Sequence, residues 1–254
     1  MLKQHPFEYR KERSTSSQAF QNFAFFEAYF SNYIEGTEFR VEEAKDIVFK
    51  GVFIENRIGD THDIKGTYEI VSNPFEMRKL PSDDESLIQL LQARHAIIMK
   101  GRLDKRPGQF KQRSNRAGNT LFVEPSLVRG TLQKAFEPYQ ALEHPLARAL
   151  FMMFLVSEIH PFEDGNGRIA RVMMNAELVA GQLTKIIIPT VYREDYLLAL
   201  RKLTRRQIPD AYIRMMDRAQ AFSHSLNLND FDALLHQLEM SNAFMESDEG
   251  RLIV

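Results

Sequence analysis

Residues Pro145–Arg171 read PLARALFMMFLVSEIHPFEDGNGRIAR and join two segments of contrasting character. The first fifteen are apolar on nearly every side, which predicts the central buried helix of the fold. A proline follows His160 and disfavours helical backbone at the residue before it, so this helix is expected to end near His160. Apolar residues at helical spacing then resume, and a second helix is expected to begin around Gly167 or Arg168 and to run to Gly181.

The rest of the chain predicts a mainly helical protein, because few segments alternate with the period of a strand. One exception is residues 112–123, where turn-forming residues and a β-rich Thr-Leu-Phe-Val run indicate a hairpin. Residues 51–74 contain glycines and mixed polarity and are read as a long loop with a short hairpin. No linker or repeat divides the chain. We therefore expect an all-α single domain of residues 1–254 with one small β-hairpin, closed by helices within residues 211–254.

Composition limits the classes of partner. The 254 residues include 33 basic and 34 acidic side chains, a balance that argues against a general affinity for nucleic acid or anionic lipid. No stretch approaches the roughly 20 apolar residues of a membrane span. The absence of cysteine excludes disulfides and thiolate chemistry and fits a reducing compartment. We expect a cytoplasmic protein with neither nucleic acid nor membrane as partner, in which histidine and carboxylates carry any acid-base or metal chemistry.

The glycine loop has the features of an anion site. Gly165, Asn166 and Gly167 stand at a helix start, where successive backbone N–H groups and the helix dipole can face one anion. Arg168 and Arg171 are three residues apart on the following helix, so both guanidinium groups can reach the same side and bind phosphate oxygens. A loop with two arginines predicts a polyphosphate ligand.

Two further residues of the run suit catalysis. Asp164, at the lip of the loop, is placed to hold Mg²⁺, which takes one or two carboxylates together with phosphate oxygens. His160 suits a general base, because an imidazole with a pKa of roughly 6.5 accepts a proton near neutral pH. Read as a catalytic metal pair, these two residues would lack a third ligand. The first residues of the chain repeat HPFE at His5–Glu8 without the glycines, so the function of the second copy must depend on the glycines and arginines after it.

The run resembles the signature of the Fic domain family, His-Pro-Phe-x-Asp/Glu-Gly-Asn-Gly-Arg-x-x-Arg, and every specified position matches. The resemblance implies an all-α core and transfer of AMP from ATP to Ser, Thr or Tyr hydroxyls of target proteins, with Mg²⁺ or Mn²⁺. It implies these roles: His160 as base, Asp164 as metal ligand, Gly165, Asn166 and Gly167 as phosphate nest, Arg168 on the polyphosphate, Arg171 on the γ-phosphate and Phe162 as buried anchor.

The hairpin and the region after the signature extend the resemblance. Fic proteins carry a flap over the site where residues 112–123 lie, and this flap pairs with a target segment by strand addition. The flap residues expected to meet the target are Asn115, Gly118, Asn119, Thr120 and Leu121. Either Tyr192 or Tyr196 could stack on adenine, although core packing is the commoner role of such tyrosines. The basic residues Arg201, Lys202, Arg205 and Arg206 are expected to form a solvated helix face.

An inhibitory motif is indicated near the N-terminus. A helix expected over residues 14–36 ends in Ser31-Asn32-Tyr33-Ile34-Glu35-Gly36, which resembles the Fic inhibitory motif. Ser31 and Glu35 are one helical turn apart and share a face. A carboxylate paired with Arg171 would occupy the donors that hold the γ-phosphate. Without the Fic signature, Glu35 would read as an ordinary glutamate before a glycine cap, Gly36. Arg171 itself is expected to face the surface and to add little to stability.

The sequence thus predicts an autoinhibited protein adenylyltransferase acting on a target protein, with a homo-oligomer left open. Kinase-like transfer, as in the Doc branch, is disfavoured because Gly167 stands where that branch has lysine. Removal of AMP, with Glu35 orienting a water, remains an alternative, as does a catalytically silent nucleotide-binding regulatory module. No motif surrounds His62, His95, His144, His224 or His236. Core packing is expected for Met152, Met153, Met173 and Met174.

Overall fold

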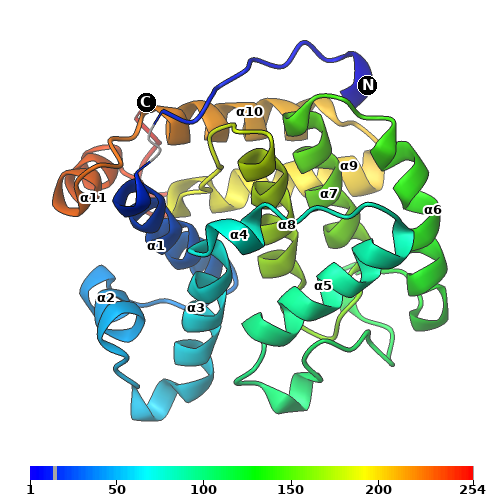
Figure 1. Cartoon of the computed structure of the whole chain (residues 1–254), viewed down its shortest axis with the longest axis horizontal. Helices are drawn as coiled ribbons and strands as arrows, with labels where there is room; N and C mark the ends of the chain where they lie inside the picture. The colour runs from blue at the N-terminus through cyan, green and yellow to red at the C-terminus, as the bar shows by residue number, and fades with distance from the viewer. Residues whose placement is uncertain (14–15, 254) are drawn as a thin grey trace.

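The computed structural model describes residues 1–13 and 16–253, and these contain eleven α-helices and one two-stranded sheet (Figure 1). The predicted all-α class with a single hairpin is confirmed. The helices are α1 Ser17–Ile34, α2 Val41–Lys50, α3 Ile58–Val71, α4 Pro74–Met77, α5 Asp84–Ile98, α6 Val128–Gln140, α7 Pro145–Ile159, α8 Asn166–Ala180, α9 Arg193–Arg206, α10 Asp210–Ser225 and α11 Phe231–Met240. The strands are β1 Arg116–Ala117 and β2 Thr120–Leu121, with Arg116 opposite Leu121.

The centre of the fold is the pair α7 and α8, which pack against each other along their length (Figure 1). α7 begins at a proline in its first turn, and the ring nitrogen Nδ1 of His144 accepts a hydrogen bond from the N–H of Leu146 at 3.0 Å. The helix ends at His160, as predicted. α8 begins at Asn166, slightly before the predicted start, and ends at Ala180. All four methionines expected in the core are buried in these two helices.

The aromatic helix predicted over residues 14–36 is α1. Residues 14 and 15 lie outside the described part of the chain, and the helix begins at Ser17 after a capping bond from the N–H of Ala19 to the Ser16 hydroxyl. Thirteen of its eighteen residues are buried, including four phenylalanines. Glu35 caps its C-terminus, and Gly36 follows with a φ of 87°.

The prediction of a long loop with a short hairpin over residues 51–74 is wrong. The segment folds into a short 3₁₀ turn, Glu55–Arg57, followed by α3 and the start of α4. α3 packs against both α1 and α5. Gly66, taken from the sequence as a loop signal, lies in mid-helix at the contact with α5, where a Cβ atom would meet the carbonyl oxygen of Ile97 at 2.7 Å. The glycine therefore permits close helix packing and does not mark a turn.

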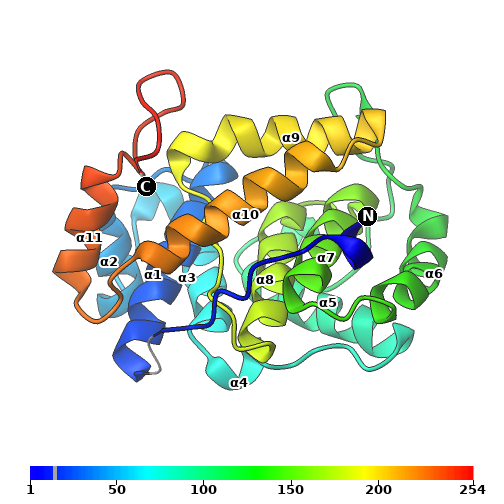
Figure 2. The same ribbon diagram turned by 90° about the horizontal axis from the view of Figure 1, so that it is seen from above.

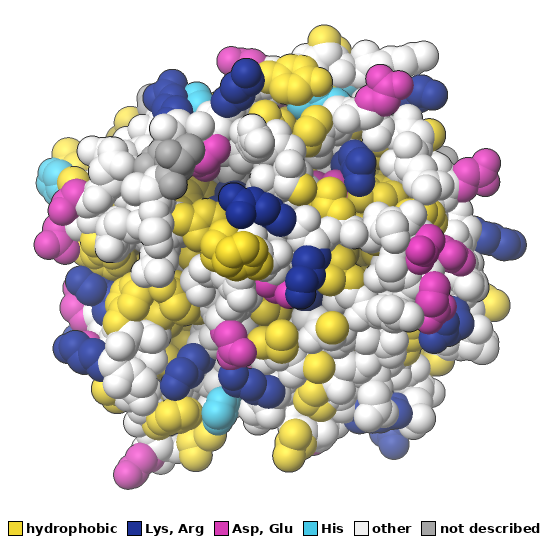
Figure 3. Space-filling model, viewed as in Figure 1, with side chains coloured by type: hydrophobic (Ala, Val, Ile, Leu, Met, Phe, Trp, Pro, Cys, Tyr) yellow, Lys and Arg dark blue, Asp and Glu magenta, His cyan; other side chains and the backbone are white. Residues whose placement is uncertain are grey.

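α9 and α10 lie side by side across one side of the central pair (Figure 2). The predicted closing region holds α10, which begins at Asp210, and α11. The N-terminal copy of HPFE takes no part in the glycine loop, because Phe7 is buried beside His144 and Arg10 is paired with Asp217 of α10 at 2.6 Å. None of the helices among the described residues has the length and apolar character needed to cross a bilayer. Basic and acidic side chains are interspersed over the face shown in Figure 3.

Candidate active site

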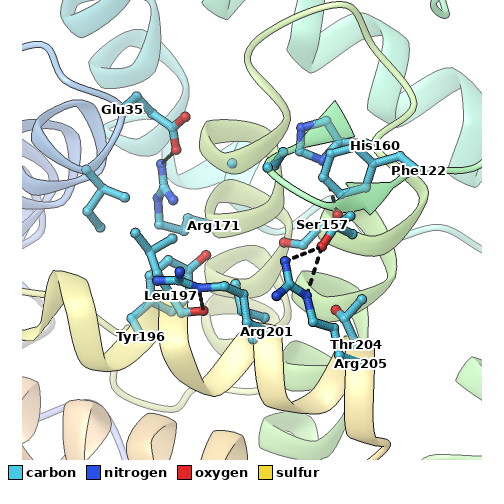
Figure 4. Close-up of a pocket in the computed structure, with 16 residues that line it drawn as sticks. Glu35, Phe122, Ser157, His160, Arg171, Tyr196, Leu197, Arg201, Thr204 and Arg205 are labelled. Carbon is cyan, nitrogen blue, oxygen red and sulfur yellow. Dashed lines mark hydrogen bonds and ion pairs between the residues drawn. The ribbon is translucent and has the colours of Figure 1, made fainter. Parts of the chain in front are cut away.

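A pocket of about 500 Å³ opens where the C-terminal ends of α1 and α7, the N-terminal end of α8, the flap and α9 meet (Figure 4). Seven of the predicted site residues line it from five parts of the fold: Glu35 after α1, Gly118 and Thr120 of the flap, His160 after α7, Gly167 and Arg171 of α8, and Tyr196 of α9. Phe122 of the flap and several residues of α9 complete its walls. In Figure 4, Glu35 and Arg171 lie on one side of the pocket and His160 with Phe122 on the other. The fold thus gathers segments that are far apart in sequence around one cavity.

His160 is held in the geometry of a base. It occupies the left-handed region, with a φ of 52°, as the residue that ends α7. Nδ1 lies 3.1 Å from the carbonyl oxygen of Ser157, which places the ring proton on Nδ1 and leaves Nε2 as an acceptor. The Phe122 ring stacks on the imidazole at 3.7 Å between centroids. Burial lowers the pKa of His160, so the ring is neutral at pH 7 and can accept a proton.

The loop after His160 is anchored by buried side chains. Phe162 is completely buried, as expected of an anchor. The side-chain amide of Asn166 accepts a hydrogen bond from the N–H of Phe162 and donates one to its carbonyl oxygen, both at 2.9 Å. Asn115 donates a third bond to the same carbonyl at 2.9 Å. The side chains of Asn166 and Asn115 therefore fix the loop and the flap, so only the backbone of Asn166 is left for the predicted nest.

His95 supports the loop from α5, a contact that the sequence did not reveal. Its ring stacks on Phe162 with centroids 3.7 Å apart and planes at 4°. Nδ1 accepts a hydrogen bond from the N–H of Gly108 at 2.9 Å, so Nε2 carries the proton and donates to the carbonyl oxygen of Asp164 at 3.0 Å. Burial lowers the pKa of His95 to about 4, which keeps this neutral tautomer at physiological pH.

The segment predicted to be inhibitory, Ser31–Gly36, is in contact with the first turns of α8. The Glu35 carboxylate lies 2.6 Å from Nη2 of Arg171. The Ser31 hydroxyl accepts from Nε of Arg171 at 2.9 Å, and the Ser31 carbonyl accepts from Nη2 at 2.8 Å. A Cβ atom on Gly167 would lie 2.1 Å from Oε1 of Glu35, so the carboxylate covers the first turn of α8. Arg171 is only 5% exposed, and the expectation that it faces the surface is wrong.

Two residues of the signature, Arg168 and Asp164, do not line the pocket. Arg168 is buried, does not line the pocket, and points toward α3, where its Nη1 lies 2.7 Å from Oδ2 of Asp63. The Asp164 side chain is 41% exposed, and its Oδ1 accepts a hydrogen bond from the N–H of Gly165 at 2.7 Å. No three His, Asp or Glu side chains among the described residues form a metal cluster. A lone carboxylate beside an anion loop fits Mg²⁺ that takes its other ligands from phosphate and water.

The flap is short and has an exposed edge. Each strand has two residues, and Gly118 turns between them with a φ of 56°. Leu121 is exposed, and the Thr120 hydroxyl accepts from Nη2 of Arg205 at 3.1 Å. Lys111, at the base of the flap, donates to the carbonyl of Ile159 at 3.2 Å, and burial lowers its pKa to about 8.

α9 provides the remaining wall. Tyr196 lines the pocket but is almost fully buried, whereas Tyr192 faces a separate hollow and does not meet the pocket. Leu197 and Leu200 supply apolar pocket surface. Arg201 and Arg205 are exposed, as expected of a solvated helix face, and both also line the pocket (Figure 4).

The chain is similar to known proteins in sequence over part of its length. Residues 86–178 match the model of the Fic/DOC family. The chain is similar to the protein adenylyltransferase Fic of Drosophila willistoni, with 26% identity over 187 residues that cover 67% of this chain and 36% of the relative. The corresponding protein of Drosophila melanogaster is 25% identical over 186 residues. The chain thus spans about a third of the length of the curated relatives it matches.

Solved structures show the same fold. Fic-1 of C. elegans (residues 134–508) aligns with a TM-score of 0.69 and 16% identity over 91% of this chain and 69% of that one. A Fic domain containing signalling protein from Bacteroides thetaiotaomicron aligns with a TM-score of 0.62 and 20% identity over 86% of this chain and 82% of that one. IbpAFic2, solved covalently tethered to Cdc42, aligns with a TM-score of 0.51 and 14% identity over 84% of this chain and 66% of that one. The complete signature, the matched segment and the shared fold make this chain similar to proteins of the Fic/DOC family.

Proposed function

We propose that this protein is an autoinhibited, Mg²⁺-dependent adenylyltransferase that transfers AMP from ATP to a Ser, Thr or Tyr hydroxyl of a target protein. The observation that carries the proposal is one pocket with a neutral histidine on one wall and an Arg171–Glu35 ion pair above the first turn of α8 on the other. The adenylyltransferase names of the Drosophila relatives support the same activity.

The chemistry follows from the position of His160. In the proposed reaction, Nε2 removes the proton from the target hydroxyl as the hydroxyl oxygen forms a bond to the α-phosphorus. The bond from the α-phosphorus to the oxygen bridging to the β-phosphorus breaks, and pyrophosphate leaves with the electron pair. The hydrogen bond from Nδ1 to the Ser157 carbonyl stabilises the imidazolium that forms, because it fixes the ring and accepts from the charged donor.

The charge of the triphosphate needs several partners. The N-terminal end of α8 offers the backbone N–H groups of Asn166 and Gly167 and the helix dipole, because the N–H of Gly165 already donates to Asp164. Arg171 is assigned to the γ-phosphate once Glu35 leaves it. Asp164 would hold Mg²⁺, which supplies electrostatic stabilisation of the phosphate charge when bound. The apolar surface of Leu197 and Leu200 provides a wall for the base, in place of the tyrosine stacking considered from the sequence.

Autoinhibition follows from competition for one guanidinium group. Glu35 and Ser31 accept hydrogen bonds from Nε and Nη2 of Arg171, so these donors are not available to a phosphate. The Glu35 carboxylate over Gly167 would also repel an anion at the nest. A target would meet the flap near Leu121 and Thr120 by strand addition. The cytoplasmic setting and the oligomeric state remain predictions.

The test uses ATP labelled at the α- or the γ-phosphate, with transfer measured onto the protein itself and onto lysate proteins. The variants are wild type, Glu35→Gly and Glu35→Gly/His160→Ala. Transfer of α-label alone, raised by the first change and abolished by the second, is the expected result. Transfer of γ-label would mean a kinase. Loss of AMP from a premodified target, with no transfer, would favour hydrolysis, since Glu35 and His160 share the pocket.

A further inference from the structure

Arg168 is held by a chain of alternating charges that begins at the surface. Arg57 pairs with Asp60 at 3.0 Å, and Asp60 pairs with Arg102 at 2.8 Å. Arg102 reaches Oδ2 of Asp63 at 2.7 Å, and the same oxygen lies 2.7 Å from Nη1 of Arg168. The side chains of the first three are about 30% exposed, whereas those of Asp63 and Arg168 are 1% and 3% exposed. These ion pairs therefore form a continuous network from the surface to the buried side of the glycine loop.

The buried end of this network is incompletely hydrogen-bonded. Nε and Nη1 of Arg168 and Oδ1 of Asp63 are buried and have no hydrogen-bond partner of good geometry. Asp63 thus holds Arg168 chiefly by charge and leaves N–H groups of the guanidinium unbonded. Buried polar groups without partners are uncommon, so this pair at the N-terminal end of α8 needs an explanation.

Two carboxylates, those of Asp63 and Asp164, lie within ion-pair distance of Arg168. Asp164 precedes Arg168 by one helical turn, and its Oδ1 lies 3.9 Å from Nη2 of Arg168. Arg168 lies closer to Asp63, at 2.7 Å, and this pair is buried where the attraction is stronger. Without the Asp63 charge, Arg168 would be free to close onto Asp164, because oppositely charged residues at this spacing attract. Asp63 therefore limits how closely Arg168 approaches the exposed carboxylate of Asp164.

We propose that Asp63, supported by Arg102, is a positioning residue that fixes Arg168 beneath the phosphate loop for binding of the polyphosphate part of the nucleotide. The inference rests on the proposed function, because it takes a nucleoside polyphosphate as the ligand. Asp63 touches no substrate in this scheme and acts through Arg168. Its removal should weaken binding of nucleotides that carry a β-phosphate more than binding of AMP.

The test measures dissociation constants of ATP, ADP and AMP by calorimetry on the full chain carrying Glu35→Gly and His160→Ala, which exposes the site and stops turnover. Asp63→Asn, which keeps the shape and removes the charge, is expected to weaken ATP and ADP about tenfold and to leave AMP within about twofold. Asp63→Glu, which restores the charge one methylene further out, should lie between the parent and Asp63→Asn. If Asp63→Asn does not fold, the same pattern of loss in Asp63→Glu carries the test.

A matched control separates positioning from stability. Glu27 and Lys185 form another buried ion pair at 2.7 Å, away from the glycine loop, so Glu27→Gln should lower thermal stability without changing the ratio of ATP to AMP affinity. In an Arg168→Gln background, Asp63→Asn should have no further effect on ATP. Unchanged ATP affinity in Asp63→Asn, or equal losses for ATP and AMP, would overturn the inference. A parent that binds no nucleotide would instead contradict the proposed function, and the inference with it.

Discussion

Glu35 and Arg171 form an ion pair 2.6 Å long between the end of α1 and the first turns of α8. The arginine is buried and the glutamate is partly exposed, and both line the wall of the pocket at the end of α1. This contact joins a residue of the proposed inhibitory motif to the last residue of the signature. Its consequences for activity and for stability can be measured separately.

Removal of the Glu35 carboxylate should raise activity. A hydrogen bond to a charged group contributes about 1.5 to 3 kcal/mol, so Glu35→Gly is expected to raise α-label transfer roughly tenfold to a hundredfold. Ser31→Ala removes a neutral acceptor of Arg171 and should raise transfer by less. Transfer is measured at ATP concentrations below saturation, where a change in affinity is visible. Equal transfer in wild type and Glu35→Gly would contradict autoinhibition by Glu35.

Arg171 should contribute to folding as well as to catalysis. Removing one partner of a buried ion pair leaves the remaining groups unsatisfied, and Arg171→Gln is expected to lower the free energy of unfolding by about 2 to 3 kcal/mol. The measurement is urea denaturation. Arg129→Gln is the control, because its pair with Glu85 is half exposed and should contribute less than about 1 kcal/mol. Similar losses in the two variants would contradict the burial argument.

The rate of transfer should fall only at acid pH. Because burial lowers the pKa of His160, the ring stays neutral below the ordinary histidine pKa of roughly 6.5. The acid limb of the rate profile of Glu35→Gly is therefore expected below that value, and His160→Ala should abolish transfer at every pH. A profile that falls already between pH 7 and 8 would be inconsistent with a neutral buried base.

His95 should make stability depend on pH. Its pKa in the folded protein is about 4, below that of the unfolded chain, so the unfolded state takes up a proton first as pH falls. The stability is fully present above about pH 6.5 and declines toward pH 4, by on the order of 3 kcal/mol for this shift. Thermal denaturation between pH 7 and pH 4 measures the decline. His95→Gln should flatten it, and His236→Gln, an exposed position on α11, should not.

The flap should affect target transfer without affecting the fold. Leu121 is 66% exposed, and Leu121→Ala is expected to change the free energy of unfolding by less than about 0.5 kcal/mol. If the exposed edge receives the target, the same change should lower α-label transfer to lysate proteins while ATP binding stays constant. Leu103→Ala is the control, because Leu103 is 79% exposed and does not line the pocket. A loss of transfer in both variants would argue against a specific role for the flap.

Local signals in the sequence predicted some parts of the site well. The apolar run and the His-Pro step marked the end of α7, because both act through the nearest backbone. The residues beneath the loop were not predictable in the same way. His95 and Asp63 come from α5 and α3, and neither lies in a motif, so their contacts appear only when the helices pack. Gly66 was taken as a loop signal for the same reason, because its actual role depends on the close approach of α5 to α3.

The two arginines of the signature show which contacts can be predicted from helical spacing and which cannot. Their separation by three residues predicts a shared side of α8, and both do lie near the loop. The spacing does not reveal that Arg168 pairs with Asp63 of α3 and Arg171 with Glu35 after α1. Which partner each guanidinium takes depends on the carboxylates that neighbouring helices bring within reach.

The burial of α1 limits how the Arg171–Glu35 contact can be opened. Thirteen of the eighteen residues of this helix lie in the core, so withdrawing it as a rigid body would expose four phenylalanines to water. Glu35 stands just beyond the helix, beside a glycine in the left-handed region. Movement of the entire helix would therefore cost far more than a local change. A rotation of the Glu35 side chain would remove one of the three contacts on Arg171, and an unwinding of the last turn would remove the Ser31 contacts as well.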